Sequence, residues 1–307
     1  MRWYKIVTPN QTWDATADPY ALNIQIDIPV SSQNTPNSGA FVRLWGISLQ
    51  TLLNAKSFNK QSISIYGGMQ QGLPLANPAE QGLLAQGSIF PALGNWVGTD
   101  MTLDFYLKAP LGTTSETGQA NVIHSWQKGQ PLSTAIKQTL TTAFPKFSLN
   151  INISPNLVLG YTDTGFYQTM GQYAAYINSI SKSVMNSPSY HGVNIATQGS
   201  TINVDDGTQA PANTQISYTD LVGQPIWTGP NTIQFKTVLR GDIPLFKEVT
   251  LPQTLATLTD SSGTNVGGSA SNLIQGKFKI TRMRHTGNFR QPDWASWCTT
   301  FDAIQSS

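Results

Sequence analysis

Strict alternation of apolar and polar residues is the feature that most limits how this chain can fold. Residues 22–28 read LNIQIDI and residues 101–108 read MTLDFYLK. Period-two alternation turns one face of a strand toward a core and the other toward water or a polar neighbour. With further strand candidates at 3–8, 41–47, 62–66 and 83–90, and turn signals at Gly67-Gly68 and Gly94-Asn95, we expect an antiparallel β-barrel over residues 1 to about 110. A short helix fits residues 48–54.

The middle of the chain has a different periodicity. Between Pro131 and Phe144, apolar residues recur every four positions, which predicts an amphipathic helix. Residues 166–185 predict a second helix, and a strand over 147–153 lies between the two. Residues 192–195 and 201–204 flank Gln198-Gly199-Ser200 as a predicted hairpin. We therefore predict a small α+β unit here.

Strand character returns after residue 210, with candidates at 233–237, 243–251, 273–284 and 294–303 and a long loop over 255–271. A faint internal echo joins the two β regions: residues 84–89 (LAQGSI) resemble 273–278 (LIQGKF), and each is followed by Gly-Asn and a final strand. Chance can also produce two short matches. If the echo is real, two homologous barrels flank an α+β insertion.

The composition points to a surface that is largely covered. Only 11% of residues are charged, against about 25% in an average soluble protein, and Asn, Gln, Ser and Thr take their place. Since burying a charge costs more than burying a hydrogen-bonded amide or hydroxyl, we expect extensive subunit contacts. The net charge of +2 implies no global attraction to DNA or acidic membranes.

Targeting and crosslinking signals are weak. A single cysteine, Cys298, excludes an internal disulfide framework. The start of the sequence lacks a secretory signal, and no apolar run reaches bilayer length, so we expect synthesis in a cytoplasm and no membrane insertion.

Signs of catalysis or of cofactor or metal binding are absent from the sequence patterns. None of the three histidines has a metal-ligand spacing, and His124 in 122–126 fits a structural role. Asp205-Asp206 precedes Gly207 in a turn pattern, and Cys298 in WASWCTTF fits a buried thiol. We predict no catalytic residue, no cofactor and no metal.

The charged feature that stands out is a basic segment near the C-terminus. As one regular strand, 277–285 would place Lys277 and Lys279 on one face and Arg282 and Arg284 on the other. That division favours subunit contact, or protection of a sheet edge, over a one-sided polynucleotide groove. The interface candidates are Lys277, Lys279, Arg282, Arg284 and Arg290.

The order of these elements, with VRLWGIS, QSISIYGG, QGLLAQGSIF, DMTLDFYL and FKITRMRHTGNFRQPDWASW, resembles the baseplate hub protein of contractile-tail bacteriophages. It is similar in layout to the T-even central hub and to the late-control gene D family, whose relatives form the base of the type VI secretion spike. The resemblance covers nearly the whole chain and rests on a diffuse pattern.

The resemblance implies a mainly β (β+α) chain of two tail-tube-like antiparallel β-barrel modules with a small α+β insertion. The implied domains are 1–125 (first barrel), 126–206 (insertion) and 207–307 (second barrel). It further implies a homotrimeric virion protein of the tail baseplate, assembled in the host cytoplasm, that joins the sixfold tail tube to the threefold spike. Partners would be the spike and the tube or tube-initiator proteins, with a tape-measure protein or DNA in the lumen.

Three other functions remain open. A tube-initiator or distal tail protein of another phage type would have one barrel. A peptidoglycan hydrolase needs a positioned glutamate or a metal, whereas the chain has only Glu80, Glu116 and Glu248, and we expect no appended lysozyme-like domain. A carbohydrate-binding β-sandwich would use exposed rows of the eight tryptophans.

Overall fold

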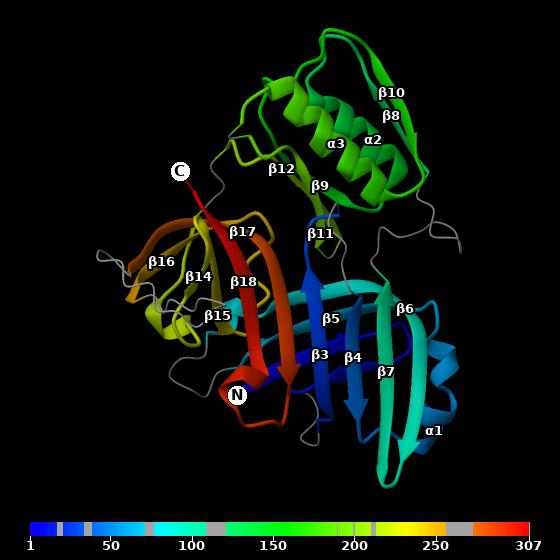
Figure 1. Ribbon diagram of the computed structural model, residues 1–307. Helices are drawn as coiled ribbons and strands as arrows, with labels where there is room; N and C mark the ends of the chain where they lie inside the picture. The colour runs from blue at the N-terminus through cyan, green and yellow to red at the C-terminus, as the bar shows by residue number, and fades with distance from the viewer. Residues whose placement is uncertain are drawn as a thin grey trace. The chain divides into compact units, whose positions relative to one another are not determined.

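The computed structural model describes residues 1–16, 21–33, 39–70, 77–108, 121–188, 190–198, 200–209, 213–255 and 273–306. These residues divide into two compact units (Figure 1). The first unit contains Met1–Val30, Ser38–Lys108 and Ala212–Ser307, and the second contains Ser31–Asn37 and Ala109–Pro211. The predicted long loop over 255–271 lies almost entirely outside the described residues.

The first unit is built on one sheet of 13 strands, which run β14-β15-β18-β17-β3-β4-β7-β6-β5-β1-β2, with β16 and β13 attached beside β17. The mainly β prediction is confirmed, whereas the predicted barrels are not: the described strands form an open path with two ends rather than a closed barrel. The strands are β1 (Arg2–Val7), β2 (Thr12–Asp14), β3 (Asn23–Val30), β4 (Ala40–Trp45), β5 (Ser62–Met69), β6 (Gly82–Val97), β7 (Asp100–Lys108), β13 (Asn213–Gln215), β14 (Ile226–Gly229), β15 (Thr232–Val238), β16 (Glu248–Leu255), β17 (Leu273–Asn288) and β18 (Trp297–Gln305).

Alternation decides which side chains fill the core of this unit. In β3, Ile24, Ile26 and Ile28 are at most 2% exposed, while Gln25 between them is exposed. Aromatic rings add large buried area: Phe105 packs against Phe58 at a ring-centroid distance of 5.4 Å. The short elements of this unit are α1 (Leu49–Leu53), η1 (Ala55–Phe58), η2 (Pro78–Glu80), η4 (Tyr218–Asp220) and η5 (Trp294–Ser296).

Five strands of the first half match five strands of the second. The order β3-β4-β7-β6-β5 corresponds to β14-β15-β18-β17-β16, and every neighbouring pair in both sets is antiparallel. The next strands differ, because β1 joins β5 antiparallel whereas β13 joins β16 parallel. The two halves therefore share a strand order but not every strand.

The register of β6 and β17 corresponds residue by residue. Each strand has 16 residues. Two positions after Gly87, Ile89 faces Leu107, and two positions after Gly276, Phe278 faces Gln305. Just beyond, both strands have a register shift, between Ile89 and Ala92 in β6 and between Ile280 and Arg282 in β17. The sequence echo therefore falls on equivalent positions of two equivalent strands, and the domain boundaries at 125 and 207 stay a prediction.

The second unit has its own core, formed by helices α2 (Leu132–Ala143) and α3 (Met170–Met185) and two small sheets. One sheet pairs β8 (Val122–Trp126) with β10 (Asp163–Tyr167), and the other has the order β11 (Asn194–Gln198), β12 (Thr201–Asp205), β9 (Ser148–Asn152). The predicted hairpin is the antiparallel pair β11–β12. The core gathers Trp126, Ile136, Leu140, Tyr173 and Ile177, all fully buried.

Several details of the predicted elements were wrong. The strand predicted over 243–251 begins only at Glu248. The second helix begins at Met170 rather than Phe166, because Phe166 belongs to β10 and Thr169 caps the helix with a capping box that includes Gln172. Gly67-Gly68 and Gly94-Asn95 are not turns but lie inside β5 and β6. A Cβ on Gly67 would lie 2.7 Å from Leu84, so this glycine allows close packing. No helix among the described residues is long and apolar enough to span a membrane.

Candidate interaction surface

The basic segment lies on β17, and a β-bulge corrects the predicted division of its charges. Phe278, Ile280, Met283 and His285 are all buried, so the register shift between Ile280 and Arg282 reverses the alternation. As a result, the side chains on the outer side of the strand include all four basic residues: Lys277, Lys279, Arg282 and Arg284. The prediction that they occupy two faces was wrong, because a regular strand was assumed.

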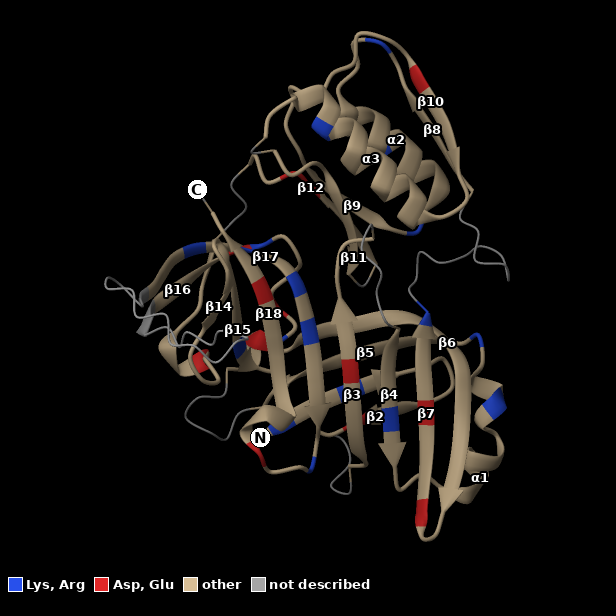
Figure 2. Cartoon of the chain, in the orientation of Figure 1, with Lys and Arg blue, Asp and Glu red and all other residues tan. Residues whose placement is uncertain are grey.

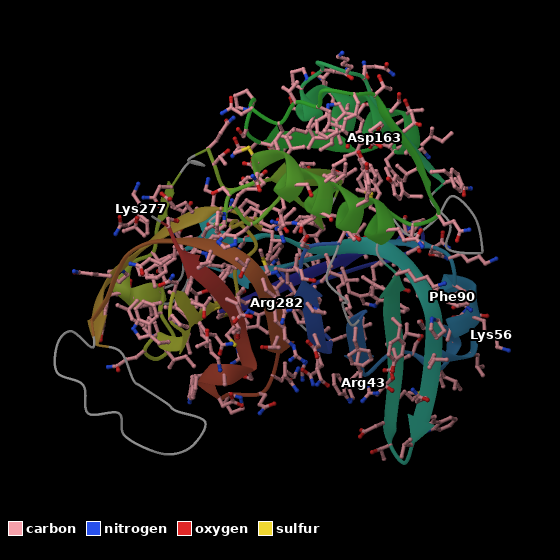
Figure 3. All side chains as sticks on the ribbon, turned by 45° about the horizontal axis from the view of Figure 1, so that its top comes forward. Arg43, Lys56, Phe90, Asp163, Lys277 and Arg282 are labelled. Atoms are coloured by element: carbon pink, nitrogen blue, oxygen red, sulfur yellow. The ribbon has the colours of Figure 1, made fainter. Side chains whose placement is uncertain are left out.

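Most of the predicted interface residues have partners within the chain. Lys277 Nζ lies 3.2 Å from Glu248 Oε1, and Lys279 Nζ lies 5.9 Å from the centre of the Phe246 ring. Arg284 forms a bidentate pair with Asp27, and the Arg290 guanidinium donates to the Ala21 carbonyl at 2.6 Å. Arg282 is exposed (Figure 3) and has no ion pair or hydrogen bond among the described residues.

Charges of opposite sign alternate across five neighbouring strands. Figure 2 shows acidic residues on β18, β3 and β7 and basic residues on β17 and β4 between them. The charged stripe consists of Asp302, Arg282, Arg284, Asp27, Arg43 and Asp104. Arg43 pairs with Asp104 through two hydrogen bonds of 2.7 Å, which raise the pKa of the guanidinium. Three cations and three carboxylates make this stripe electrically neutral, which suits a protein partner better than a polyanion.

The β17 segment also joins the two halves of the first unit. Residues 283–288 pair antiparallel with β3, from Met283 opposite Val30 to Asn288 opposite Gln25. The Arg284–Asp27 ion pair spans this junction, and Trp297 Nε1 donates to the Gly68 carbonyl at 3.0 Å. Arg284 therefore stabilises a contact inside the chain.

Arg240 forms a second link between the halves. It is 4% exposed, and its guanidinium makes two 2.7 Å hydrogen bonds to Asp242 and lies 3.3 Å from Glu80 and 3.7 Å from Asp220. Burial by itself would lower the pKa of Arg240. The hydrogen bond to Asp242 and the negative charges of the three carboxylates have the larger combined effect, so the pKa is raised. Burial also raises the pKa of Glu80. Nothing in the sequence around Arg240 indicated this cluster.

The two buried histidines contact hydroxyl groups inside the protein. His124 Nδ1 lies 3.2 Å from both Thr139 Oγ1 and Tyr173 Oη, and His285 Nδ1 lies 2.9 Å from Thr299 Oγ1. Burial lowers the pKa of both histidines. Cys298 is buried, and no cluster of three potential metal ligands occurs among the described residues.

Exposed apolar side chains near the end of β6 and on α1 were not predicted. They are Leu93, Trp96 and Val97 of β6 and Leu49 and Leu53 of α1. Trp96 is 61% exposed and Val97 75%. None of the residues of α1 is buried, and only the structure could show this.

Comparison with family models and with curated protein sequences gives no match. Solved structures do share the fold. The E. coli c3393 protein, described as a type VI secretion component similar to T4 bacteriophage tail proteins gp27 and gp5, matches 99% of this chain and 77% of its own, with a TM-score of 0.54 and 10% identity.

Two prophage or bacterial tail proteins match to a similar degree. The 43 kDa tail protein of prophage MuSo2 from Shewanella oneidensis has a TM-score of 0.54 and 8% identity over 100% of this chain and 98% of its own. The tail protein from Neisseria meningitidis MC58 has a TM-score of 0.51 and 12% identity over 99% and 96%. This chain thus has a fold found in phage tail proteins.

Proposed function

We propose that this chain is a structural, non-enzymatic protein of a phage tail, the central hub of its baseplate. In this role, three copies would form an adaptor between the sixfold tail tube and the threefold spike. The observation that carries the proposal is the pair of matched five-strand sets within one chain. Three chains with two such sets present six similar modules, which is the number needed to meet a sixfold ring.

The same duplication favours the hub over a tube-initiator or distal tail protein, for which we expect one set. A peptidoglycan hydrolase would need a free carboxylate in a cleft. Glu80 and Glu248 are instead engaged in ion pairs with Arg240 and Lys277, and Glu116 lies outside the described residues. Structural roles thus account for both described glutamates.

The proposed partners follow from this role. The spike and the tube or tube-initiator proteins would contact the trimer in the virion, with a tape-measure protein or DNA passing through its lumen. We assign Arg282 to subunit or partner contacts, because it is the exposed cation of the charged stripe without a partner in the described part of the chain. Lys277, Lys279, Arg284 and Arg290 would assist it from the same region.

Light scattering and electron microscopy of the protein, alone and mixed with the tail spike of the same phage, test the proposal. We expect trimers with threefold symmetry whose ring shows six similar lobes. A particle that stays a monomer or forms a dimer or hexamer with the spike present would contradict the hub. The Arg282→Ala variant tests the contact assignment separately, because the fold should survive it.

A further inference from the structure

One junction between matched modules is complete inside the chain. There, residues 283–288 of β17 pair with β3, so β3 has a strand on both edges. In the matched sets, β6 corresponds to β17 and β14 corresponds to β3. On β6, β5 pairs only residues 82–88, and on β14 the single paired strand is β15. Among the described residues, β6 beyond Ala92 and β14 therefore each have one edge without a neighbouring strand.

The register identifies which residues of these open edges are equivalent to the complete junction. Because Leu107 of β7 is equivalent to Gln305 of β18, Asp100 is equivalent to Cys298. Val97 faces Asp100 and Thr286 faces Cys298, so Val97 corresponds to Thr286. In the same way, Gly229 faces Thr232 as Asp27 faces Phe41. Because Thr286 faces Asp27 inside the chain, the equivalent contact would place Val97 beside Gly229.

The open edge of β14 is one end of the strand path, whereas that of β6 is the part of an inner strand that β5 leaves uncovered. A chain with one complete junction and one complementary pair of open edges can repeat that junction only with another copy. Contacts of this head-to-tail kind close into a ring when the rotation between copies allows it. Edge strands with unpaired backbone groups are also the usual templates for strand addition.

The open edge of β6 carries large exposed apolar side chains, which are typical of a surface that a partner covers. Leu93, Trp96 and Val97 are 44%, 61% and 75% exposed, and Leu53 of the adjacent α1 is 74% exposed. Helix α1 lies against β6, since a Cβ on Gly94 would lie 2.9 Å from the Leu52 carbonyl oxygen. Figure 3 marks Phe90 and Lys56 on this side of the first unit. Burial of such apolar area stabilises association by roughly 25 cal/mol per Å² before the costs of ordering.

We propose that the end of the β6–β7 hairpin of one copy docks beside β14 of a second copy, with Val97 next to Gly229, in the arrangement that β17 and β3 adopt within the chain. This contact names the subunit interface of the trimer proposed above and rests on that proposal. Three such contacts would join the sheets of three copies edge to edge.

Engineered cysteines test the contact directly. In a Cys298→Ser background, which removes the natural thiol, Val97→Cys is combined with Gly229→Cys, the position that faces Val97 in the proposed register. The matched control combines Val97→Cys with Ser183→Cys, an exposed position on α3 of the second unit. The purified proteins are oxidised and separated by denaturing electrophoresis, and light scattering records their oligomeric state before oxidation.

We expect covalent dimers and trimers from the 97–229 pair and their loss in the control and in both single-cysteine variants. A trimer by light scattering that yields no 97–229 crosslink would overturn the edge contact and leave the trimeric hub standing. A protein that remains monomeric with and without spike, and does not crosslink, would overturn both. Crosslinking to an added tail tube protein instead of a second copy would also reject the contact.

Discussion

Arg284 on β17 and Asp27 on β3 form a bidentate ion pair across the junction of the two matched halves, with Nε–Oδ1 at 2.7 Å and Nη2–Oδ2 at 2.6 Å. The hydrogen bond to Asp27 raises the pKa of Arg284. Both side chains remain partly open to solvent, at 59% and 38% exposure. Water therefore screens much of the attraction between them.

The first prediction follows from that exposure. Arg284→Ala should lower the free energy of unfolding by no more than about 1 kcal/mol, the usual range of an exposed ion pair. Urea unfolding measures this value, and Asp27→Ala should give a similar loss with no further loss in the double variant. A much larger effect would mean that Arg284 is buried in an assembly, as in a subunit contact.

Arg282 should behave differently. Because it is exposed and has no described partner, Arg282→Ala should change chain stability by less than about 0.5 kcal/mol while weakening assembly with the spike, as measured by light scattering. The competing role in the lumen predicts normal assembly and salt-dependent DNA binding by the wild type that the variant loses. That second outcome would reject the assignment of Arg282 to protein contacts.

Arg240→Ala should be among the most damaging single changes. It leaves Glu80, Asp220 and Asp242 close together without their shared cation, and breaking a buried pair costs about 3–5 kcal/mol. Burial already raises the pKa of Glu80, so this carboxyl can take a proton when the cation is lost. The deficit relative to wild type, measured by urea unfolding, should therefore shrink at acidic pH, and a deficit independent of pH would contradict this electrostatic account.

The buried His285 should make stability depend on pH. Burial lowers its pKa from 6.5 to about 4, so between these values the unfolded chain holds a proton that the folded chain does not. Stability is thus full above the unfolded pKa and falls as the pH drops toward 4. A shift of this size corresponds to about 3 kcal/mol, and buried His124 acts in the same direction.

Denaturant unfolding at neutral pH and near the folded pKa measures this loss. His285→Gln should reduce the pH dependence, whereas the exposed control His191→Gln should leave it unchanged. Equal pH dependence in wild type and His285→Gln would show that other groups are responsible.

Close backbone contact between Gly82 and Gly241 should not tolerate a methyl group. A Cβ on Gly82 would lie 2.6 Å from the carbonyl carbon and oxygen of Gly241. Backbone cannot move aside as a flexible side chain does, so Gly82→Ala should cost about 1–3 kcal/mol. Gly160→Ala is the matched control, since nothing lies within 4 Å of its Cβ position. Thermal unfolding of both variants compares them, and equal melting temperatures would contradict the crowding.

Alternation and helical periodicity in the sequence were enough to predict most of the local elements. The strands around Ile24 and Phe105 and the helix after Pro131 were all predicted, because each pattern reports directly on which side chains must leave water. The echo at Gln86-Gly87 and Gln275-Gly276 also marked equivalent strand positions before any register was known.

The bulge after Ile280, the pairing of β17 with β3 and the cluster around Arg240 were decided only by tertiary structure. A bulge shifts the faces of a strand by one residue, and assuming a regular strand across the polar pair Thr281-Arg282 is why Lys277 and Arg282 were assigned to opposite faces. Asp27 and Arg284 are 257 residues apart in the chain, and their contact depends on which sheet edges meet. Local sequence determines which face of a segment is apolar, whereas strand partners are chosen by the total burial and hydrogen bonding of the folded sheet.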